Sequence, residues 1–166
     1  MLNKNVYLIG FMGAGKSTVG HELAKLMSIN FFDLDEAIVE NKGMDIADIF
    51  HEHGEETFRL WEKEVLFQQE GEGAIIATGG GIVETKDNLL FMLKTGHVVY
   101  LQAPFNLLFS RIASDSNRPL TKEGEKGLKE RFNRRRAFYE KASTTLNTEN
   151  KTPVQIAHEI FKLITV

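Results

Sequence analysis

The chain has 166 residues, no cysteine and a net charge of -3. Its length suits one domain with a substantial core, and 42% hydrophobic with 26% charged residues is the composition of a globular protein. The absence of cysteine excludes disulfides and thiolate metal sites and suits the cytoplasm. The apolar runs are too short to cross a bilayer, and residues 1–5 lead directly into the first expected strand, which leaves no room for a signal peptide. The negative charge argues against a nucleic-acid partner, so anionic ligands must be bound by local groups of Arg and Lys.

The first expected elements flank a phosphate-binding motif. An apolar run predicts a buried strand at Asn5–Ile9, and apolar side chains at helical spacing predict a helix over Lys16–Met27. Between them, residues 10–18 read G-F-M-G-A-G-K-S-T and fill every fixed position of the G-x-x-x-x-G-K-[ST] phosphate loop. Glycine lets the backbone N–H groups surround a polyphosphate, and the start of the helix directs its positive dipole end at the same anion. The alternative is a glycine-rich turn with a chance lysine, and the flanking strand and helix count against it.

Each residue type in this loop has a role in nucleotide chemistry. Lys16 supplies a point charge for the β- and γ-phosphates, and Ser17 offers a hydroxyl to Mg²⁺. The motif predicts ATP and Mg²⁺ as ligands. The residues expected to bind the nucleotide are Gly13, Ala14, Gly15, Lys16, Ser17 and Thr18.

Two aspartates follow the second apolar run. If the segment 31–35, F-F-D-L-D, is a short strand that runs into a loop, its period of two places Asp33 and Asp35 on the same side, at the sheet edge where open α/β proteins bind ligands. In the alternative, Asp35 only caps a helix that starts at Glu36.

Residues 36–69 have helical patterns and no strand signal, with breaks expected at Gly43 and Gly54. Such a helical insertion between two strands is a natural substrate-binding region. It contains an apolar stripe of Phe58, Trp61 and Val65, with Arg59 and Glu62 on its flank. Taken alone, Arg59 fits a solvated surface arginine better than a ligand-binding one.

Residues 74–81 predict a β-branched strand that ends in three glycines. Three glycines in a row suggest a backbone that lies flush against something, although a mobile loop is the alternative. A helix at Asp87–Leu93, a strand at His97–Leu101 and a helix after Pro104 are expected next. Neither of these strands ends in aspartate, so Asp33 is the natural metal-binding carboxylate and could hold Mg²⁺ through water.

Residues 114–127 are polar, rich in charge and glycine, and contain Arg118-Pro119-Leu120, which is typical of a mobile lid. An arginine on a lid reaches the site only on closure, where it can stabilise charge during phosphoryl transfer. An exposed loop arginine is the alternative for Arg118.

The next segment, Leu128 to Ala142, is expected to be a helix with Arg135 in the middle of its apolar face and Arg134 and Arg136 turned outward. An arginine on a buried face needs an anionic partner. Arg135 is therefore either half of an internal ion pair or a ligand for a carboxylate substrate. A strand at Thr144–Leu146 and a loop come next, and Thr152 and Pro153 open a last helix whose apolar side is expected to hold Val154, Ala157, Ile160, Phe161 and Ile164.

Taken together, these motifs resemble those of the shikimate kinases, which are phosphate-loop kinases related in fold to nucleoside monophosphate kinases. The resemblance covers nearly the whole chain in order. It rests on G-F-M-G-A-G-K-S-T, D-L-D-E (33–36), G-E-E-T-F-R-L-W-E (54–62), T-G-G-G (78–81), R-P-L (118–120) and R-x-x-x-Y (135–139). The first motif is common to many nucleotide enzymes, whereas the set of D-x-D, F-R-x-x-E and G-G-G is much more specific.

The resemblance implies a role for each matching residue on the acceptor side. Asp35 would bind shikimate hydroxyls and accept the proton of the attacking one, and Arg59 and Arg135 would pair with the shikimate carboxylate. The backbone at Gly80 and Gly81 would bind the side of the ring that carries the hydroxyls. The family's usual proline after the substrate arginine is absent here, because Arg136, Ala137 and Phe138 follow Arg135.

On the nucleotide side, the resemblance implies that Lys16 contacts the transferred phosphate, Ser17 binds Mg²⁺ and Asp33 reaches the ion through water. Arg118 would be the lid arginine, and Arg111 and the loop after Leu146 would border the adenine.

We therefore expect a monomeric ATP- and Mg²⁺-dependent shikimate kinase with a three-layer α/β/α fold around a five-stranded parallel sheet. Residues 1–166 would form a single domain with a substrate-binding insertion at about 34–62 and a lid at about 113–127. Gluconate or a nucleoside monophosphate is the alternative acceptor. A nucleotide-binding module without catalysis would have no reason to place Asp35, Arg59 and Arg135 around one pocket.

Overall fold

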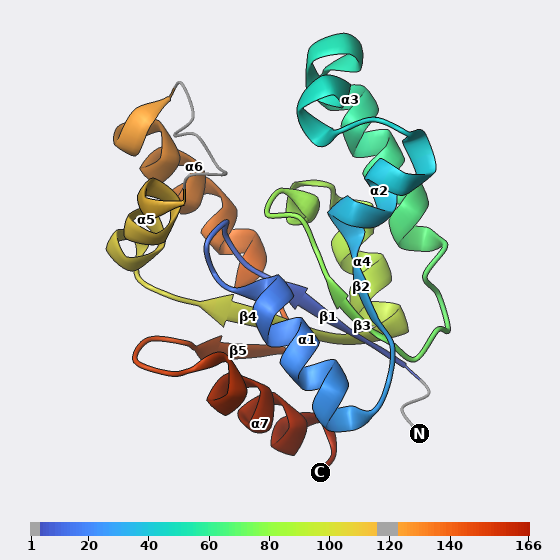
Figure 1. Cartoon of the computed structure of the whole chain (residues 1–166), viewed down its shortest axis with the longest axis vertical. Coiled ribbons are helices and arrows are strands. Elements are labelled where there is room, and N and C mark those ends of the chain that lie inside the picture. Colours follow the sequence, from blue (N-terminus) through green and yellow to red (C-terminus); the bar gives the residue numbers. More distant parts are fainter. Residues whose placement is uncertain (1–3, 116–122) are drawn as a thin grey trace.

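The computed structural model describes residues 4–115 and 123–166, and its core is a five-stranded parallel sheet in the order β2-β3-β1-β4-β5. Helices cover both faces of the sheet (Figure 1), which confirms the predicted three-layer class. The strands are β1 (Asn5–Ile9), β2 (Phe31–Asp33), β3 (Ile75–Ala77), β4 (Gly96–Gln102) and β5 (Thr144–Asn147). The helices are α1 (Lys16–Met27), α2 (Leu34–Lys42), α3 (Ile46–Phe67), the short 3₁₀ helix η1 (Ile82–Glu84), α4 (Lys86–Thr95), α5 (Phe105–Ser114), α6 (Gly124–Tyr139) and α7 (Pro153–Ile164).

The central strand β1 is buried along its whole length between β3 and β4. Val6 pairs with Ile75 on one side and with His97 on the other. Because helices cover both faces, a central parallel strand reads as a continuous apolar run rather than an alternating one. This burial explains why β1, β3 and β4 were recognisable in the sequence.

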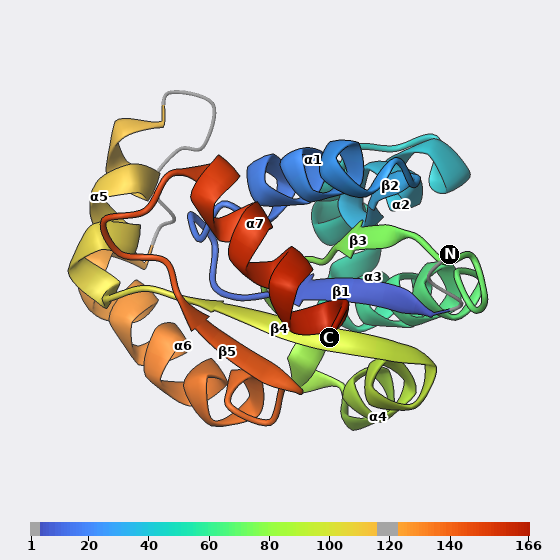
Figure 2. The ribbon, with the colours of Figure 1, turned by 90° about the horizontal axis from the view of Figure 1, so that it is seen from below.

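Helices α1 and α7 lie on one face of the sheet, and α4 and α6 lie on the other (Figure 2). A capping box begins α7, in which Thr152 and Gln155 each accept a hydrogen bond from the other's backbone N–H. The predicted apolar side of α7 is wrong at Val154, which is 47% exposed. Its buried stripe runs through Ile156, Ala157 and Ile160, and Val154 lies roughly 110° around the helix from the centre of that stripe.

The insertion between β2 and β3 consists of α2 and α3, and both predicted breaks are confirmed. Gly43 ends α2 in the left-handed conformation, and Gly54 interrupts α3 with φ 81° and ψ 169°. Phe58 and Val65 are buried as the stripe predicted. Glu62 was expected on the flank of this stripe, but its side chain is completely buried.

The helix that carries the arginine run is α6. It begins at Gly124, four residues before the predicted start, and it ends at Tyr139, so Ala142 lies beyond it. Arg135 is buried in its apolar face, and Arg134 and Arg136 are exposed, as predicted. The described parts of the expected lid belong largely to the end of α5 and the start of α6.

The carboxyl ends of all five strands meet at one edge of the sheet, because the strands are parallel. On that side, α2 and α3 rise at one end of the sheet, and α5 and α6 rise at the other (Figure 1). Within residues 4–115 and 123–166, none of the helices is both long enough and apolar enough to span a membrane.

Candidate active site

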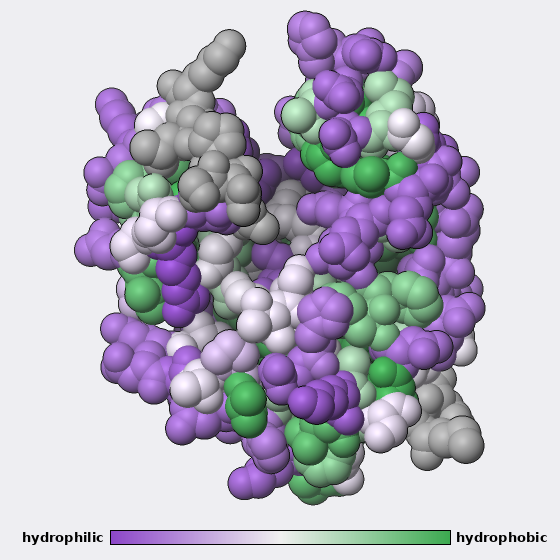
Figure 3. Space-filling view, viewed as in Figure 1, coloured by the Kyte–Doolittle hydropathy of each residue, from purple (hydrophilic) through white to green (hydrophobic). Residues whose placement is uncertain are grey.

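A cleft of about 890 Å³ opens at the carboxyl edge of the sheet. Figure 3 shows this side of the molecule as a hollow between two arms. Every described residue that the sequence predicted for the site lines this cleft, namely Gly13, Ala14, Gly15, Lys16, Ser17, Thr18, Asp33, Asp35, Arg59, Gly80, Gly81, Arg111 and Arg135. Arg118 lies outside the described residues.

The phosphate loop connects β1 to α1 and depends on its glycines. Gly10, Gly13 and Gly15 all have positive φ angles, of 153°, 81° and 86°. A Cβ atom on Gly10 would lie 2.9 Å from the Leu101 carbonyl oxygen, so no larger residue fits there. At the N-terminus of α1, Gly15 provides no side-chain cap. The first N–H groups of α1 therefore point into the cleft with the positive end of the helix dipole, which makes an anion site.

The ammonium group of Lys16 lies across this loop. Its Nζ donates to the carbonyl oxygens of Gly10 at 2.7 Å and Phe11 at 3.1 Å. The charge is thus held at the phosphate loop by the loop's own backbone.

Ser17 and Asp33 bring two oxygen groups together from α1 and β2. The Ser17 hydroxyl donates to Oδ2 of Asp33 at 2.5 Å. The other carboxylate oxygen of Asp33 accepts hydrogen bonds from the backbone N–H groups of Asp35 and Glu36 and so caps α2. A hydroxyl beside a carboxylate, next to a phosphate site, is a donor set that suits Mg²⁺.

The local structure around Asp35 differs from both predictions made for it. The chain enters α2 at Leu34, so Asp35 lies in the first helical turn and not on an extension of the strand. Asp33 and not Asp35 is the helix cap. Asp35 nevertheless lines the cleft, and a Cβ atom on Gly79 would lie only 3.0 Å from its Oδ1.

Each of the three consecutive glycines makes room for polar side chains of the site. A Cβ atom on Gly79 would crowd the carboxylates of Asp35 and Glu62, and one on Gly80 would lie 3.2 Å from Nη1 of Arg135. A Cβ atom on Gly81 would overlap the guanidinium group of Arg59. The prediction that this backbone lies flush against other groups is therefore confirmed.

Arg59 is only 19% exposed and lies in a network of carboxylates. Its Nη1 donates to Oε1 of Glu62 at 2.9 Å, and its Nη2 lies 3.5 Å from Glu55. It is therefore not the solvated surface arginine of the alternative interpretation. Burial raises the pKa of Glu62 to about 7, although the charge of Arg59 acts to lower it. The second oxygen of Glu62 is buried without a hydrogen-bond partner among the described residues.

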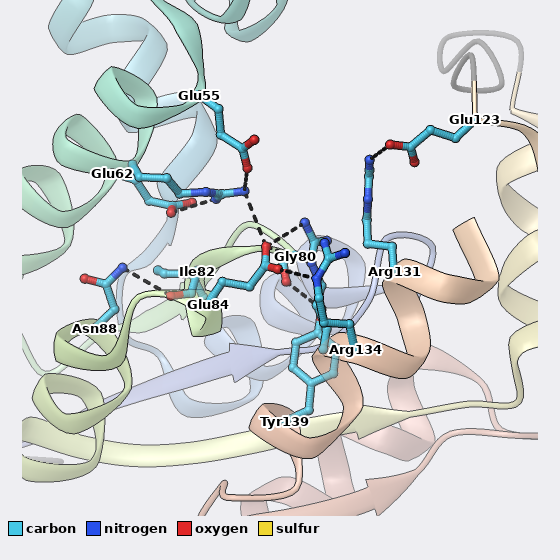
Figure 4. Close-up of polar contacts among 12 residues, drawn as sticks. Glu55, Glu62, Gly80, Ile82, Glu84, Asn88, Glu123, Arg131, Arg134 and Tyr139 are labelled. Atoms are coloured by element: carbon cyan, nitrogen blue, oxygen red, sulfur yellow. Dashed lines mark hydrogen bonds and ion pairs between the residues drawn. The ribbon is translucent and has the colours of Figure 1, made fainter. Parts of the chain in front are cut away.

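Arg135 forms the internal ion pair that its burial required. Its Nε donates to Oε2 of Glu84 at 3.2 Å, and its side chain is 7% exposed. Figure 4 shows Glu84 facing α6. Burial acts to raise the pKa of Glu84, but the charges of Arg135 and Arg134 lower it overall. One turn along α6, the Tyr139 hydroxyl donates to the Gly80 carbonyl and fastens the helix to the glycine segment. Arg135 also lines the cleft, so the ion pair does not exclude a contact with a ligand.

Two further walls complete the cleft. From α5, Arg111 donates to the Gly13 carbonyl at 2.9 Å, which places its guanidinium group beside the phosphate loop. The cleft extends from there to Thr148 and Lys151 after β5. Ile46, Phe50 and Phe58 give it an apolar wall on the α3 side.

Sequence reasoning missed Glu84 entirely. The residue ends a 3₁₀ turn three positions after the last glycine, and no periodic pattern or motif marks it. Glu84 pairs with Arg134 and Arg135, which lie 50 and 51 positions further along the chain. These ion pairs become visible only in the folded chain. Tyr139 entered the sequence analysis only as the last residue of the R-x-x-x-Y motif, and nothing in the sequence indicated its hydrogen bond to Gly80.

These features define a class: an α/β phosphate-loop protein in which two arginines line a cleft beside the phosphate loop. The family model for shikimate kinase matches residues 12–165. The chain is 42% identical to the shikimate kinase of Sulfurihydrogenibium sp. (strain YO3AOP1) over 164 residues, which cover 97% of this chain and 98% of the relative. The chain belongs to the shikimate kinase family.

Solved structures agree with this assignment. Shikimate kinase from Acinetobacter baumannii, solved in complex with shikimate, superposes with a TM-score of 0.91 at 37% identity, covering 97% of this chain and 92% of that one. Shikimate kinase from Aquifex aeolicus superposes with a TM-score of 0.86 at 37% identity, covering 96% and 95% of the two chains.

Proposed function

We propose that the chain transfers the terminal phosphoryl group of ATP to a ring hydroxyl of shikimate and so forms shikimate 3-phosphate. The observation that carries this proposal is the convergence of Arg59 from α3 and Arg135 from α6 on one cleft, beside Asp35 and the phosphate loop. Two guanidinium groups from separate elements suit one carboxylate, which they can bind with paired hydrogen bonds. Family membership supports the same reaction.

On the acceptor side, Arg59 and Arg135 hold the carboxylate, and the backbone at Gly80 and Gly81 supports the ring. Asp35 orients the attacking hydroxyl and takes its proton late. Phosphoryl transfer depends more on positioning and charge neutralisation than on a strong base. A carboxylate with a hydrogen-bonding role is therefore sufficient at position 35.

On the nucleotide side, the backbone of residues 13–18 surrounds the phosphates, and Lys16 leaves the loop carbonyls to contact the transferred group. Ser17 and Asp33 would hold Mg²⁺, with Asp33 acting through water. When bound, the ion neutralises charge on the phosphates. The described residues contain no group of three or more His, Asp or Glu side chains that could hold a metal, so phosphate oxygens and water would complete the shell.

The proposal also assigns roles to two longer regions of the chain. Residues 34–62 form the acceptor-binding region, and residues 113–127 form a lid that delivers Arg118 to the phosphates. Arg111 borders the adenine. Closure of such a lid excludes water, which protects ATP from hydrolysis.

We further propose that the enzyme works as a monomer in the cytoplasm, where ATP is available. Support for a monomer is that a single chain provides every side chain assigned here to ATP or the acceptor. Support for the cytoplasm is the absence of cysteine from the sequence. Light scattering of the purified chain tests the first point, and a mass of two chains would contradict it.

The function is tested by measuring ADP release with shikimate, gluconate, AMP or no acceptor. We expect the rate to rise only with shikimate, and phosphate to appear on the 3-hydroxyl in the product. A rate that rises with gluconate or AMP but not with shikimate would reject the assignment.

A further inference from the structure

Glu84 lies where guanidinium groups from two helices meet. Its Oε2 accepts from Nε of Arg135 and lies 3.2 Å from Nη2 of the same side chain, and its Oε1 accepts from Nε of Arg134 at 3.0 Å. From the opposite side, Nη2 of Arg59 lies 3.9 Å from Oε2. Figure 4 shows the contacts of α3 and α6 converging on this carboxylate.

A guanidinium group can bind a carboxylate with two hydrogen bonds along one of its edges. The contact with Glu84 occupies one such edge of Arg135. This edge consists of Nε and Nη2, and both lie 3.2 Å from the same oxygen of Glu84. The remaining nitrogen, Nη1, is turned toward Gly80. An acceptor carboxylate in this part of the cleft would therefore share Arg135 with Glu84.

The pairing has a clear cause in the free protein. Arg135 is 6% exposed, and an unpaired charge at that depth is costly. Glu84 supplies the anion when no acceptor is present. Once an acceptor is bound, two carboxylates contact the same pair of arginines, and like charges at such distances repel each other.

We propose that Glu84 is a built-in counter-anion of the carboxylate subsite, which neutralises Arg135 in the free protein and weakens binding of the acceptor's carboxylate. The inference rests on the proposed function, because the subsite is the one assigned there to Arg59 and Arg135. It makes Glu84 a residue that sets acceptor affinity without contacting the reacting atoms.

The sign of the effect separates this role from a purely structural one. If Glu84 only held Arg135 in place, removing its charge would loosen the arginine and weaken acceptor binding. If Glu84 competes with the acceptor, the same change destabilises the free protein and removes a repulsion from the complex, and both effects tighten binding.

The test compares the wild-type chain with Glu84→Gln by calorimetric titration with shikimate and, separately, with ATP. We expect Kd for shikimate to fall by about three- to tenfold, because one negative charge is removed near the ligand. Kd for ATP should stay within about twofold, and the melting temperature without ligand should fall. The control is Glu140→Gln, which removes the exposed partner of Arg136 at the end of the same helix and should change neither Kd.

An unchanged or higher Kd for shikimate in Glu84→Gln overturns the inference when the wild-type chain binds shikimate normally. If the wild-type chain binds ATP but not shikimate, the proposed acceptor is wrong and the inference falls with it. Should Glu84→Gln fail to fold, Glu84→Asp keeps the charge but withdraws it from Arg135 by one methylene group. It should then show a Kd below that of the wild type, and an equal or higher value is again a contradiction.

Discussion

Arg59 and Glu62 form an ion pair with 2.9 Å between Nη1 and Oε1, in which the carboxylate is completely buried and the guanidinium group still reaches the cleft. The pair spans one turn of α3, so a single helix provides both the cleft-lining charge and its partner. Burial keeps the pKa of Glu62 near 7, far above its ordinary value of 4.5, although Arg59 opposes the shift. The pair therefore links the stability of α3 to pH.

The first prediction concerns this link. Glu62 binds its proton more tightly in the folded chain than in the unfolded chain, so its contribution to stability is complete below about pH 4.5 and is lost as the pH rises through about 7. Relative to Glu62→Gln, the wild-type chain should lose about 1–3 kcal/mol between pH 5 and pH 8. Urea unfolding of both proteins at several pH values measures the difference. Glu140→Gln is the control, and its free energy of unfolding should change with pH as that of the wild type does. If the free energy of unfolding of Glu62→Gln also changes with pH as that of the wild type does, the raised pKa of Glu62 is contradicted.

The second prediction tests the proposed carboxylate ligand Arg135. Arg135→Lys keeps a positive charge but replaces the planar fork by a point charge, so KM for shikimate should rise by about 10- to 100-fold while KM for ATP changes little. Steady-state kinetics with each substrate varied in turn provide both values. Arg136→Lys, on the exposed side of the same helix, is the matched control. Equal changes in the two KM values would count against Arg135 as a carboxylate ligand.

A third prediction concerns the acceptor hydroxyl. Asp35→Asn removes the group that we propose to orient the hydroxyl and take its proton, so kcat should fall by about 10²- to 10⁴-fold. ATP affinity, measured by calorimetry, should remain unchanged because the phosphate loop is untouched. Glu36→Gln changes the neighbouring carboxylate in the same helical turn and should retain normal turnover. Normal turnover in Asp35→Asn would remove this residue from the mechanism.

The fourth prediction uses the close approach of Gly81 to Arg59. A Cβ atom at position 81 overlaps the end of a flexible side chain and not the backbone, so Gly81→Ala should displace Arg59 and leave the fold intact. KM for shikimate should rise by about tenfold, because one of two carboxylate ligands is moved. The melting temperature and KM for ATP serve as internal controls. A large loss of melting temperature with an unchanged KM for shikimate would show that the glycine matters for folding and not for the site.

The buried strands and the helices that cover them were predictable, because burial requires apolar residues at the spacing of a strand or of a helix face. The bounds of β1 and α1 were predicted without error, since a continuous apolar run and a helical period flank an unmistakable glycine loop. The predictions were wrong where contacts with a neighbouring element decide the local structure. Asp33 ends β2 and caps α2, so the strand does not run on to Asp35, and Val154 faces solvent because α7 buries a different stripe.

The sequence by itself determined the phosphate loop, the parallel α/β class and most of the charged residues that line the cleft, because glycine turns and buried strands and helices leave a pattern in the local spacing of residues. Only the tertiary structure decided how these charges are matched. Arg59 and Arg135 lie 76 positions apart in the chain, and their common neighbour Glu84 belongs to a turn with no motif of its own. Which charged residues form ion pairs depends on their distance in the folded chain. A periodic pattern along the sequence carries no information about that distance.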